Sequence, residues 1–355
     1  MPTLSTLYRY VVERPAFLAH LARLGIPLYV RHIPAVTLEM TNACNLRCPV
    51  CPVPSIKRKK GFMAEGDFET IMGKFPSSVK WMRLNYAGEP LLHKRIFGLI
   101  KRGKETRPDI EVSIATNATA LGGFNSQEIV DSGVDVIYVS IDGATKRTHE
   151  MYRVGSSFEQ VTENVKALCD YKRRVGAKKP MVIQQTLLHK ESAKEIPQIR
   201  ELASKLGVDE LALRYFTLPT LTCDLESLKR DWIMYSKMNP GDAETLKERF
   251  LSSEDYSQYE RRPDGTYVLK GAMNRCAPFP FIMWNGDVAT CCHDPEGVMT
   301  FGNLVRESWN AVMRRMPVWK TFTKQLEICR HCDVTSLGVN FSLTPVNVHA
   351  ERVQA

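Results

Sequence analysis

The sequence lacks a hydrophobic run that could cross a membrane, because a spanning helix needs about 18 to 20 consecutive apolar residues. Its best candidate, Ala16 to Val30, is interrupted by His20 and Arg23. The first thirty residues also lack the apolar core of a secretory signal, since arginines are scattered through their apolar positions. We therefore expect a cytoplasmic protein.

The sequence also lacks a nucleic-acid recognition motif, although 48 Lys and Arg against 39 Asp and Glu give a formal net charge of +9. Basic residues cluster only at 57–60 and 172–174, and no aromatic pattern accompanies either cluster. We interpret both clusters as solvated surface and expect no nucleic-acid partner. The excess of positive charge is compatible with an acidic partner or an anionic substrate.

The composition, 44% hydrophobic and 25% charged, is that of a globular protein and excludes disordered and fibrous classes. A chain of 355 residues buries roughly 75% of its unfolded surface, so it needs no disulfides to fold. Its length favours two domains, at roughly 150 residues each.

Apolar, β-branched segments alternate with segments long enough for helices, which predicts a parallel sheet with right-handed crossovers. The expected strands are 35–41, 80–86, 110–115, 136–141, 181–187 and 210–215. The expected helices are 68–75, 96–105, 126–132, 158–174 and 193–206. Six units are fewer than the eight of a closed barrel, so the predicted fold is α/β, an open partial (β/α)6 barrel. Functional residues are expected at the carboxyl ends of its strands.

This barrel is predicted over residues 35–220, with other segments on both sides of it. Residues 1–34 combine four arginines and no lysine with apolar positions, which suits a helix that caps the barrel or one that lies on a membrane surface. Residues 221–270 are polar and form a linker or helical segment. Residues 271–335 form a small α+β domain, with a hairpin turn at Asn285-Gly286-Asp287 and a helix over 303–315. Residues 336–355 are a tail.

Ten cysteines are the most informative feature, and eight of them fall into two groups. In the first group, Cys44, Cys48 and Cys51 follow the first strand with the spacing C-x3-C-x2-C. Three thiolates on one loop suit an iron–sulfur cluster, which normally takes four, so one iron would remain open to a second ligand. A structural zinc ion is the alternative, although zinc sites usually pair two C-x2-C units or add histidines.

The cysteine loop resembles the signature of the radical SAM superfamily, in which it follows the first strand of a partial (β/α)6 barrel. The resemblance implies that Cys44, Cys48 and Cys51 bind a [4Fe-4S] cluster whose open iron binds S-adenosylmethionine (SAM). One electron from the cluster then cleaves SAM to methionine and a 5′-deoxyadenosyl radical. A reductase, flavodoxin or ferredoxin is the implied electron donor.

Three further segments match the family pattern in order and imply SAM-binding residues. Gly88 and Glu89 lie in the sequence Asn-Tyr-Ala-Gly-Glu-Pro, which looks like the family's Gly-Gly-Glu-Pro motif. In that motif the glutamate accepts a hydrogen bond from the amino group of SAM. Thr116-Asn117 matches the segment near the SAM ribose, with alanine in place of the family's glycine at the next position. Ser140 and Arg153 match residues that contact the methionyl group, and a guanidinium suits its carboxylate.

The second cysteine group resembles the SPASM/twitch extension, which binds auxiliary [4Fe-4S] clusters. A full SPASM domain needs about seven cysteines, so the five here favour the shorter twitch form with one cluster. The implied ligands are Cys276, Cys291, Cys329 and Cys332. Cys291 is preferred over Cys292 because of its position after the hairpin. The same four thiolates would also suit a structural zinc ion.

Related enzymes oxidise small carbohydrates, epimerise a carbon or modify peptides. Those that modify peptides usually carry a leader-binding domain before the cysteine loop, and only 43 residues precede Cys44. We therefore expect a small carbohydrate-like or anionic substrate, and a two-electron oxidation that uses one auxiliary cluster. A redox-neutral epimerase, a peptide maturase, and a non-enzymatic iron–sulfur or zinc protein are the alternatives.

The catalytic residues are predicted only as candidates. Oxidation requires a base near the carboxyl ends of the strands. Epimerisation instead requires a thiol that returns a hydrogen atom. The candidate bases are Arg214, Gln185, His189 and His293, and the candidate thiols are Cys223 and Cys292.

Overall fold

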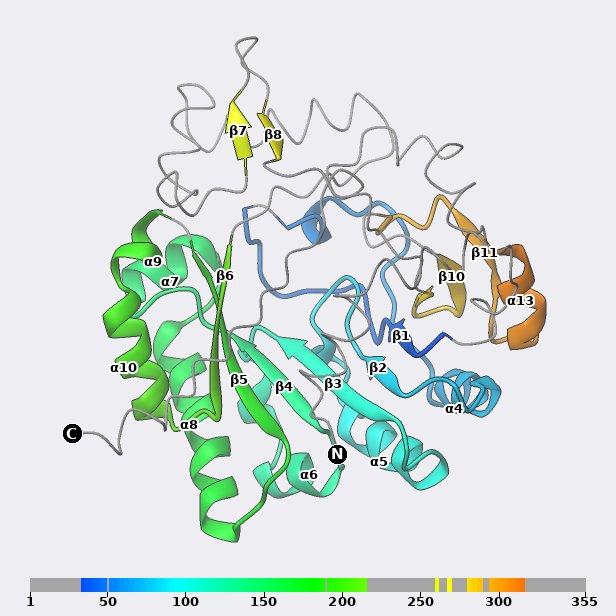
Figure 1. Cartoon of the computed structure of the whole chain (residues 1–355), viewed down its shortest axis with the longest axis horizontal. Helices are drawn as coiled ribbons and strands as arrows, with labels where there is room; N and C mark the ends of the chain where they lie inside the picture. Colours follow the sequence, from blue (N-terminus) through cyan, green and yellow to red (C-terminus); the bar gives the residue numbers. More distant parts are fainter. Residues whose placement is uncertain are drawn as a thin grey trace, which may run out of the picture.

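The computed structural model describes residues 33–49, 51–188, 190–215, 259–261, 267–269, 280–289 and 294–316. Their main feature is a nine-stranded sheet in the order β11-β10-β9-β1-β2-β3-β4-β5-β6 (Figure 1). Neighbouring strands from β1 to β6 pair in parallel, as the sequence predicts. These strands are β1 (Ala35–Leu38), β2 (Trp81–Arg83), β3 (Glu111–Thr116), β4 (Val136–Ser140), β5 (Met181–Leu188) and β6 (Glu210–Tyr215).

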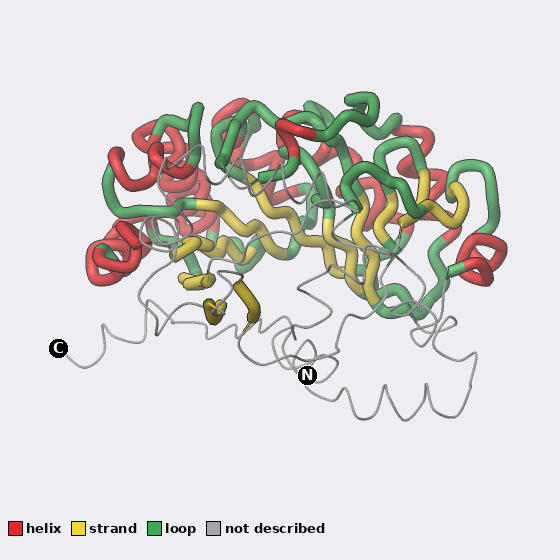
Figure 2. Tube along the Cα trace, turned by 90° about the horizontal axis from the view of Figure 1, so that it is seen from above, coloured by secondary structure: helices red, strands yellow, loops and turns green. Residues whose placement is uncertain are grey.

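Helices between consecutive strands lie along the outer side of this curved sheet (Figure 1). Figure 2 shows them mostly on one side of the strands. The arrangement is the expected α/β fold, an open partial barrel. The helices are α4 (Glu65–Lys74), α5 (Ile96–Thr106), α6 (Ser126–Asp131), α7 (Lys146–Tyr152), α8 (Phe158–Val175), α9 (Lys190–Lys194) and α10 (Ile196–Leu206).

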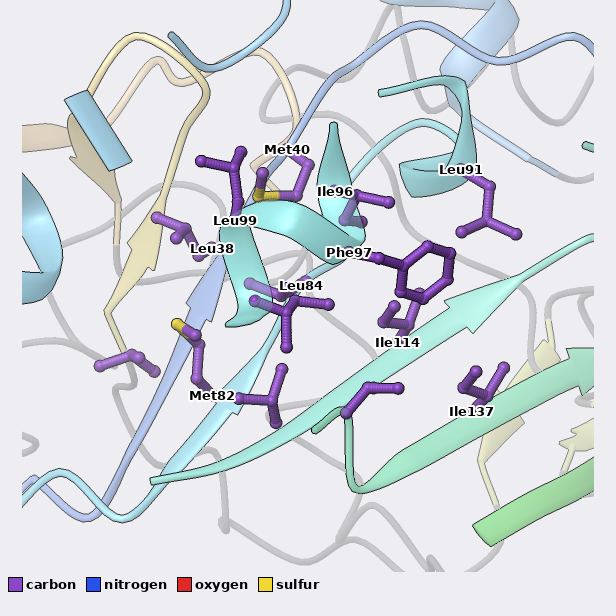
Figure 3. Packing of buried hydrophobic residues seen from close by; sticks show 14 of the residues in the cluster. Leu38, Met40, Met82, Leu84, Leu91, Ile96, Phe97, Leu99, Ile114 and Ile137 are labelled. Atoms are coloured by element: carbon purple, nitrogen blue, oxygen red, sulfur yellow. The ribbon is translucent and has the colours of Figure 1, made fainter. Parts of the chain in front are cut away.

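The main hydrophobic core lies between the sheet and these helices, because alternate strand residues point to the helix side. Figure 3 shows residues of β1 to β4 packed against α5 in this core, among them Leu38, Met82 and Phe97. Each such side chain contributes about 1.5–3 kcal/mol when fully buried. The intervening residues face the inner side of the sheet, where Val136, Ile183 and Ala212 form a separate small cluster.

The helix α4 begins three residues earlier than predicted, and α7 was not predicted. Two other helices differ from their predicted bounds, and in each case a local residue explains why. The segment predicted as one helix over 193–206 is divided into α9 and α10, because Pro197 stands in the first turn of α10 and has no N–H to donate. The helix predicted over 303–315 is α13 (Trp309–Arg315), which begins after Ser308. The Ser308 hydroxyl caps this helix by accepting from the Ala311 N–H.

The hairpin predicted around Asn285-Gly286-Asp287 is present and continues the barrel sheet. Gly286 occupies the turn at φ 85°, a conformation that favours glycine. β9 (Phe281–Ile282) pairs in parallel with β1 on one side and antiparallel with β10 (Asp287–Ala289) on the other, and β11 (Thr300–Asn303) follows. The sequence predicts the hairpin but not its attachment to β1.

The segment expected as a linker or helix over 221–270 contributes two short antiparallel strands, β7 (Tyr259–Arg261) and β8 (Tyr267–Leu269). Within the described ranges, no helix has both the length and the apolar character that crossing a membrane requires. Membrane-surface contact by residues 1–34 stays a prediction, because almost all of them lie outside the described residues.

Candidate functional site

The cysteine loop begins directly beyond β1 and presents three unpaired thiols, Cys44, Cys48 and Cys51. The loop is tightly folded: the Cys51 N–H donates to the Cys48 carbonyl at 3.0 Å, and the Leu46 N–H approaches the Cys44 Sγ at 3.4 Å. Burial raises the pKa of all three thiols, that of Cys51 to about 11. Because metal ligands must be deprotonated, loading this loop with metal releases protons.

Two side chains at the start of the loop determine its path. The Thr41 hydroxyl accepts from the Ala43 N–H at 3.0 Å and donates to the Gly61 carbonyl at 2.7 Å. The Asn42 amide donates to the Lys59 carbonyl at 3.0 Å and accepts from the Gly61 N–H at 2.9 Å. The first and last parts of the segment from 41 to 61 are therefore joined, and the three cysteines lie between them.

The Gly88-Glu89 segment beyond β2 lies directly against the cysteine loop. Gly88 has φ +85°, and a Cβ at this position would stand 2.4 Å from the Thr41 carbonyl oxygen and 2.7 Å from that of Ala43. The Glu89 N–H donates to the same Ala43 carbonyl at 2.7 Å. Only glycine allows this approach, so the motif glycine holds the loop against the end of β2.

The Glu89 carboxylate joins the ends of β2 and β3. It is buried and accepts from the Leu91 N–H at 3.0 Å, the Thr116 hydroxyl at 2.6 Å and the Asn117 N–H at 2.7 Å. Burial raises its pKa, while the Asn117 N–H acts in the opposite direction. A carboxylate has about four acceptor positions, so one remains for an ammonium group.

Asn117 connects the end of β3 to the first cysteine. Its Nδ2 donates to the Asn45 Oδ1 at 3.1 Å and lies 3.9 Å from the Cys44 Sγ. The next residue, Ala118, takes the place of the family's glycine and adopts φ 59°. This left-handed conformation costs an alanine roughly 1–2 kcal/mol, a cost that glycine at this position would not have.

Arg153 lies close to the second cysteine and is oriented by Asp142. Its Nε donates to the Asp142 carboxylate, and its Nη1 lies 3.8 Å from the Cys48 Sγ. The other Asp142 oxygen accepts from the Leu187 N–H at 2.7 Å. Asp142 is absent from the residues predicted as functional; its position just beyond the predicted fourth strand, ahead of Arg153, is the signal that could have identified it. Ser140 is buried at the end of β4 beside these groups.

The three thiols suit a cluster better than a single ion. The described part of the chain contains no group of three His, Cys, Asp or Glu side chains arranged to hold one metal ion. In an iron–sulfur cluster each cysteine binds a different iron, so the sulfur atoms stand further apart than ligands of one ion. The donor set, three free thiols on one loop, therefore fits a [4Fe-4S] cluster.

His149, in α7, supports Asp142 and should make the stability of the chain pH-dependent. Its buried ring accepts from the Asp142 N–H through Nδ1 at 3.3 Å, and its Nε2 lies 3.1 Å from the Ser156 hydroxyl. Burial lowers the pKa of His149 from 6.5 to about 4. Between these values the unfolded chain binds a proton that the folded chain does not, so stability falls as the pH decreases.

The free energy of unfolding should fall by about 2.5 kcal/mol between pH 7 and pH 4.5 through this one group. The His149→Asn variant keeps a polar side chain that stays uncharged over this range, so it should lose about that much less than the wild type. Urea unfolding of both proteins at the two pH values measures the difference. Equal losses in the two proteins would contradict the assignment.

Several predicted site residues lie outside the described residues. They are Cys223, Cys276, Cys291, Cys292, Cys329, Cys332, His189 and His293. Arg214 belongs to β6, but the position of its side chain is not described. Gln185 is half-buried in β5, opposite Ser140 in the parallel register. The structure thus brings together the predicted groups on β1 to β4, and the roles of the others stay predictions.

Comparison with known proteins decides the family. Residues 38–203 match the radical SAM superfamily, and residues 279–333 match SPASM, an iron–sulfur cluster-binding domain. The chain belongs to the radical SAM superfamily. Its cofactors are accordingly SAM and a [4Fe-4S] cluster, and the SPASM region implies auxiliary iron–sulfur binding.

The curated relatives of this radical SAM chain carry names that refer to different activities. The tungsten-containing aldehyde ferredoxin oxidoreductase cofactor-modifying protein of Pyrococcus furiosus is 30% identical over 178 residues, 49% of each chain. The AdoMet-dependent heme synthase of Methanosarcina barkeri is 28% identical over 69% of this chain and 62% of its own. The GTP 3′,8-cyclase of Aliarcobacter butzleri is 24% identical over 50% of this chain and 54% of its own. The chain thus spans about half to three-fifths of the length of these relatives.

Solved structures support the same fold. Streptococcus suis SuiB bound to the precursor peptide SuiA has a TM-score of 0.56 and 15% identity, covering 91% of this chain and 73% of SuiB. The protein anSMEcpe with bound AdoMet has a TM-score of 0.52 and 14% identity, covering 79% of this chain and 77% of that one. At these identities the similarity is one of fold alone.

Proposed function

We propose that this radical SAM enzyme removes a hydrogen atom from a small anionic substrate and oxidises it by two electrons. The arrangement of Cys44, Cys48 and Cys51 beside Glu89 and Arg153 carries this proposal. These groups offer thiolates for a cluster, an acceptor for an ammonium and a donor for a carboxylate at one edge of the sheet. When bound, the clusters and SAM supply the radical that removes hydrogen and the acceptor for the second electron.

Four residues divide the binding of SAM among them in this proposal. Glu89 accepts from the amino group with its remaining acceptor position, and Arg153 pairs with the carboxylate through nitrogens that Asp142 does not use. Asn117 and Ser140, at the ends of β3 and β4, would contact the rest of the SAM molecule. The base that removes the proton is then His189 or His293, because Gln185 has no basic group and the guanidinium of Arg214 stays protonated.

Arg83 supports an anionic substrate. Its neighbours Met82 and Leu84 are buried in the core on the helix side, so Arg83 points to the inner face of the sheet. There it is exposed, with its guanidinium carbon 5.8 Å from the centre of the Tyr138 ring. Among the described residues it forms no ion pair, so its charge is available to a ligand. Contact with the Tyr138 ring restrains the Arg83 guanidinium without neutralising its charge.

The relatives' names agree with a small substrate. They refer to a cofactor, to heme and to GTP, and the last is a phosphate-bearing anion. By analogy we propose that this chain also acts on a small molecule that carries a phosphate or carboxylate group. The names of the relatives refer to different reactions, so they do not favour an oxidation in particular. The proposal of a two-electron oxidation depends instead on the second cysteine group.

The Arg83→Gln variant tests the substrate class. A panel of small phosphates and carboxylates is first screened anaerobically with SAM and dithionite for the compound that increases 5′-deoxyadenosine. For that compound, Arg83→Gln should raise KM roughly tenfold, since a hydrogen bond to a charged group contributes about 1.5 kcal/mol. SAM cleavage without substrate should stay unchanged.

Two further variants serve as controls for Arg83→Gln. Arg83→Lys keeps the charge and should restore part of the affinity. Lys80→Gln removes an equal charge from the opposite end of β2, where Lys80 pairs with Asp109, and should leave KM unchanged. A KM in Arg83→Gln equal to that of the wild type would reject Arg83 as the substrate anchor.

A further inference from the structure

Arg58 makes a buried ion pair although it belongs to the basic cluster expected on the surface. Its guanidinium donates through both terminal nitrogens to the carboxylate of Glu39, the residue that follows β1. The side chains of Arg58 and Glu39 are 14% and 0% exposed. An arginine held in this bidentate way has a fixed position. The segment that follows the cysteine loop is therefore anchored to the end of the first strand.

Glu39 also contacts two other parts of the site. Its carboxylate accepts from the Ala87 N–H at 3.3 Å, next to the motif glycine Gly88, and from the Trp284 N–H at 3.2 Å, beyond β9. One buried carboxylate thus joins the segment after the cysteine loop, the motif after β2 and the hairpin of the SPASM region.

The same segment contacts the chain on the far side of the hairpin. The Lys57 and Arg58 N–H groups donate to the Glu296 carboxylate at 2.8 and 3.0 Å, and the Arg58 Nε donates to the Pro295 carbonyl. Gly61 packs closely against the indole of Trp284, where a Cβ would stand 2.5 Å from ring atoms. We call Glu39, Arg58, Trp284 and Glu296 the Glu39 junction.

The position of the junction in the sequence indicates its role. Trp284 precedes Cys291 and Cys292, and Glu296 follows them, so the junction holds the chain on both sides of these cysteines. Arg58 follows Cys51 by seven residues, in the segment after the first cysteine loop. We propose that the Glu39 junction is a positioning device, which fixes the chain at Trp284 and at Glu296, before and after the expected auxiliary ligand Cys291, relative to the loop of Cys44, Cys48 and Cys51. This inference rests on the proposed function.

The alternative is that the junction only stabilises the fold, as other buried ion pairs do. Asp135 provides the matched comparison, because it is also buried, pairs with Lys104 and Lys179, and accepts from the Val112 N–H. It lies just before β4, at the opposite end of the strands from the cysteine loop. Asp135→Asn therefore removes a comparable charge without touching the junction.

Hydrogen exchange of the chain tests the positioning directly, without depending on turnover. In Glu39→Gln, amide exchange of peptides covering 84–88 and 281–289 should become roughly tenfold faster, because the Ala87 and Trp284 N–H groups lose a charged acceptor. Peptides from β4 to β6 should keep their protection. Asp135→Asn should leave exchange of both peptides unchanged. Unchanged exchange in Glu39→Gln, or equal acceleration in Asp135→Asn, would overturn the proposal.

The loaded enzyme provides the second readout. In Glu39→Gln the electron paramagnetic resonance signal attributed to the auxiliary cluster should change, and product formed per 5′-deoxyadenosine should fall several-fold. Glu39→Asp, which restores the charge, should recover part of this coupling. Wild-type coupling in Glu39→Gln would overturn the positioning role, whereas a wild type that does not cleave SAM would refute the proposed function instead. If Glu39→Gln does not fold, Glu296→Gln tests the same contact to the Lys57 and Arg58 amides.

Discussion

A chain in which Cys44, Cys48 and Cys51 are all replaced by Ala should contain about four fewer irons than the wild type and should no longer cleave SAM. The three thiols are the side chains on the loop that suit iron, and each would bind a different iron. Without them the cluster has no attachment beside Glu89 and Arg153. Iron analysis of the reconstituted protein and detection of 5′-deoxyadenosine after anaerobic reduction measure both effects.

Cys169→Ala is the matched control for the triple variant. Cys169 is also a buried free thiol, but it belongs to α8 and packs in the main hydrophobic core. Its removal should cost some stability while iron content and SAM cleavage stay at wild-type values. An iron content in the triple variant equal to that of the wild type would show that the cluster is attached elsewhere.

Replacing Cys276 or Cys329 by Ala should eliminate product while leaving part of the SAM cleavage intact. Removing one hydrogen atom from the substrate leaves an unpaired electron, and oxidation is complete only when that electron has an acceptor. The second cysteine group would hold the acceptor, whereas the loop of Cys44, Cys48 and Cys51 is unchanged in these variants. Quantifying product and 5′-deoxyadenosine in the same reaction separates the two steps.

The variants Cys223→Ala and Cys292→Ala distinguish oxidation from epimerisation by a thiol donor. If oxidation is the reaction, neither thiol donates a hydrogen atom, and Cys223→Ala should keep the wild-type ratio of product to 5′-deoxyadenosine. Normal product formation in Cys276→Ala and Cys329→Ala, together with its loss in Cys223→Ala or Cys292→Ala, would instead favour epimerisation by a thiol donor.

The parts of the site that sequence alone could predict are those built from short segments. The C-x3-C-x2-C spacing, the Gly88-Glu89 pair and Arg153 each belong to a pattern of a few residues beyond a strand. Parallel strands bring their carboxyl ends to one edge of the sheet, so the order of the motifs was enough to bring them together. Hydrogen bonds from Thr116 and Asn117 to Glu89 agree with that expectation.

The Glu39 junction could not be predicted in this way. Arg58 stands in a run of four basic residues, for which solvated surface is the usual interpretation, and the residues it contacts at Pro295 and Glu296 lie more than 200 positions further along the chain. Only the parallel pairing of β1 with β9 brings these parts together. Glu39 itself directly follows β1, and a single acidic residue in the sequence does not indicate which residue it pairs with.

The contacts of Lys60 could not be predicted from the sequence either. Its ammonium donates to the carbonyls of Asn42 and Val53 at 3.1 and 2.9 Å, so this residue of the basic cluster also holds the cysteine loop rather than facing solvent alone. Backbone carbonyls leave no trace in a sequence pattern. The interpretation of 57–60 as solvated surface was therefore wrong for Arg58, whereas Lys60 is exposed as expected but also contacts the cysteine loop.

One measurement tests the central claim most directly: turnover with SAM, dithionite and the activating substrate in deuterium oxide, followed by mass spectrometry of the product and 5′-deoxyadenosine. We expect equal amounts of the two, with a product that has lost two hydrogen atoms and carries no deuterium on carbon. A product of unchanged composition with one deuterium on carbon would contradict oxidation and indicate a thiol donor. Absence of 5′-deoxyadenosine with every substrate, from protein loaded with iron, would contradict the radical mechanism for this chain.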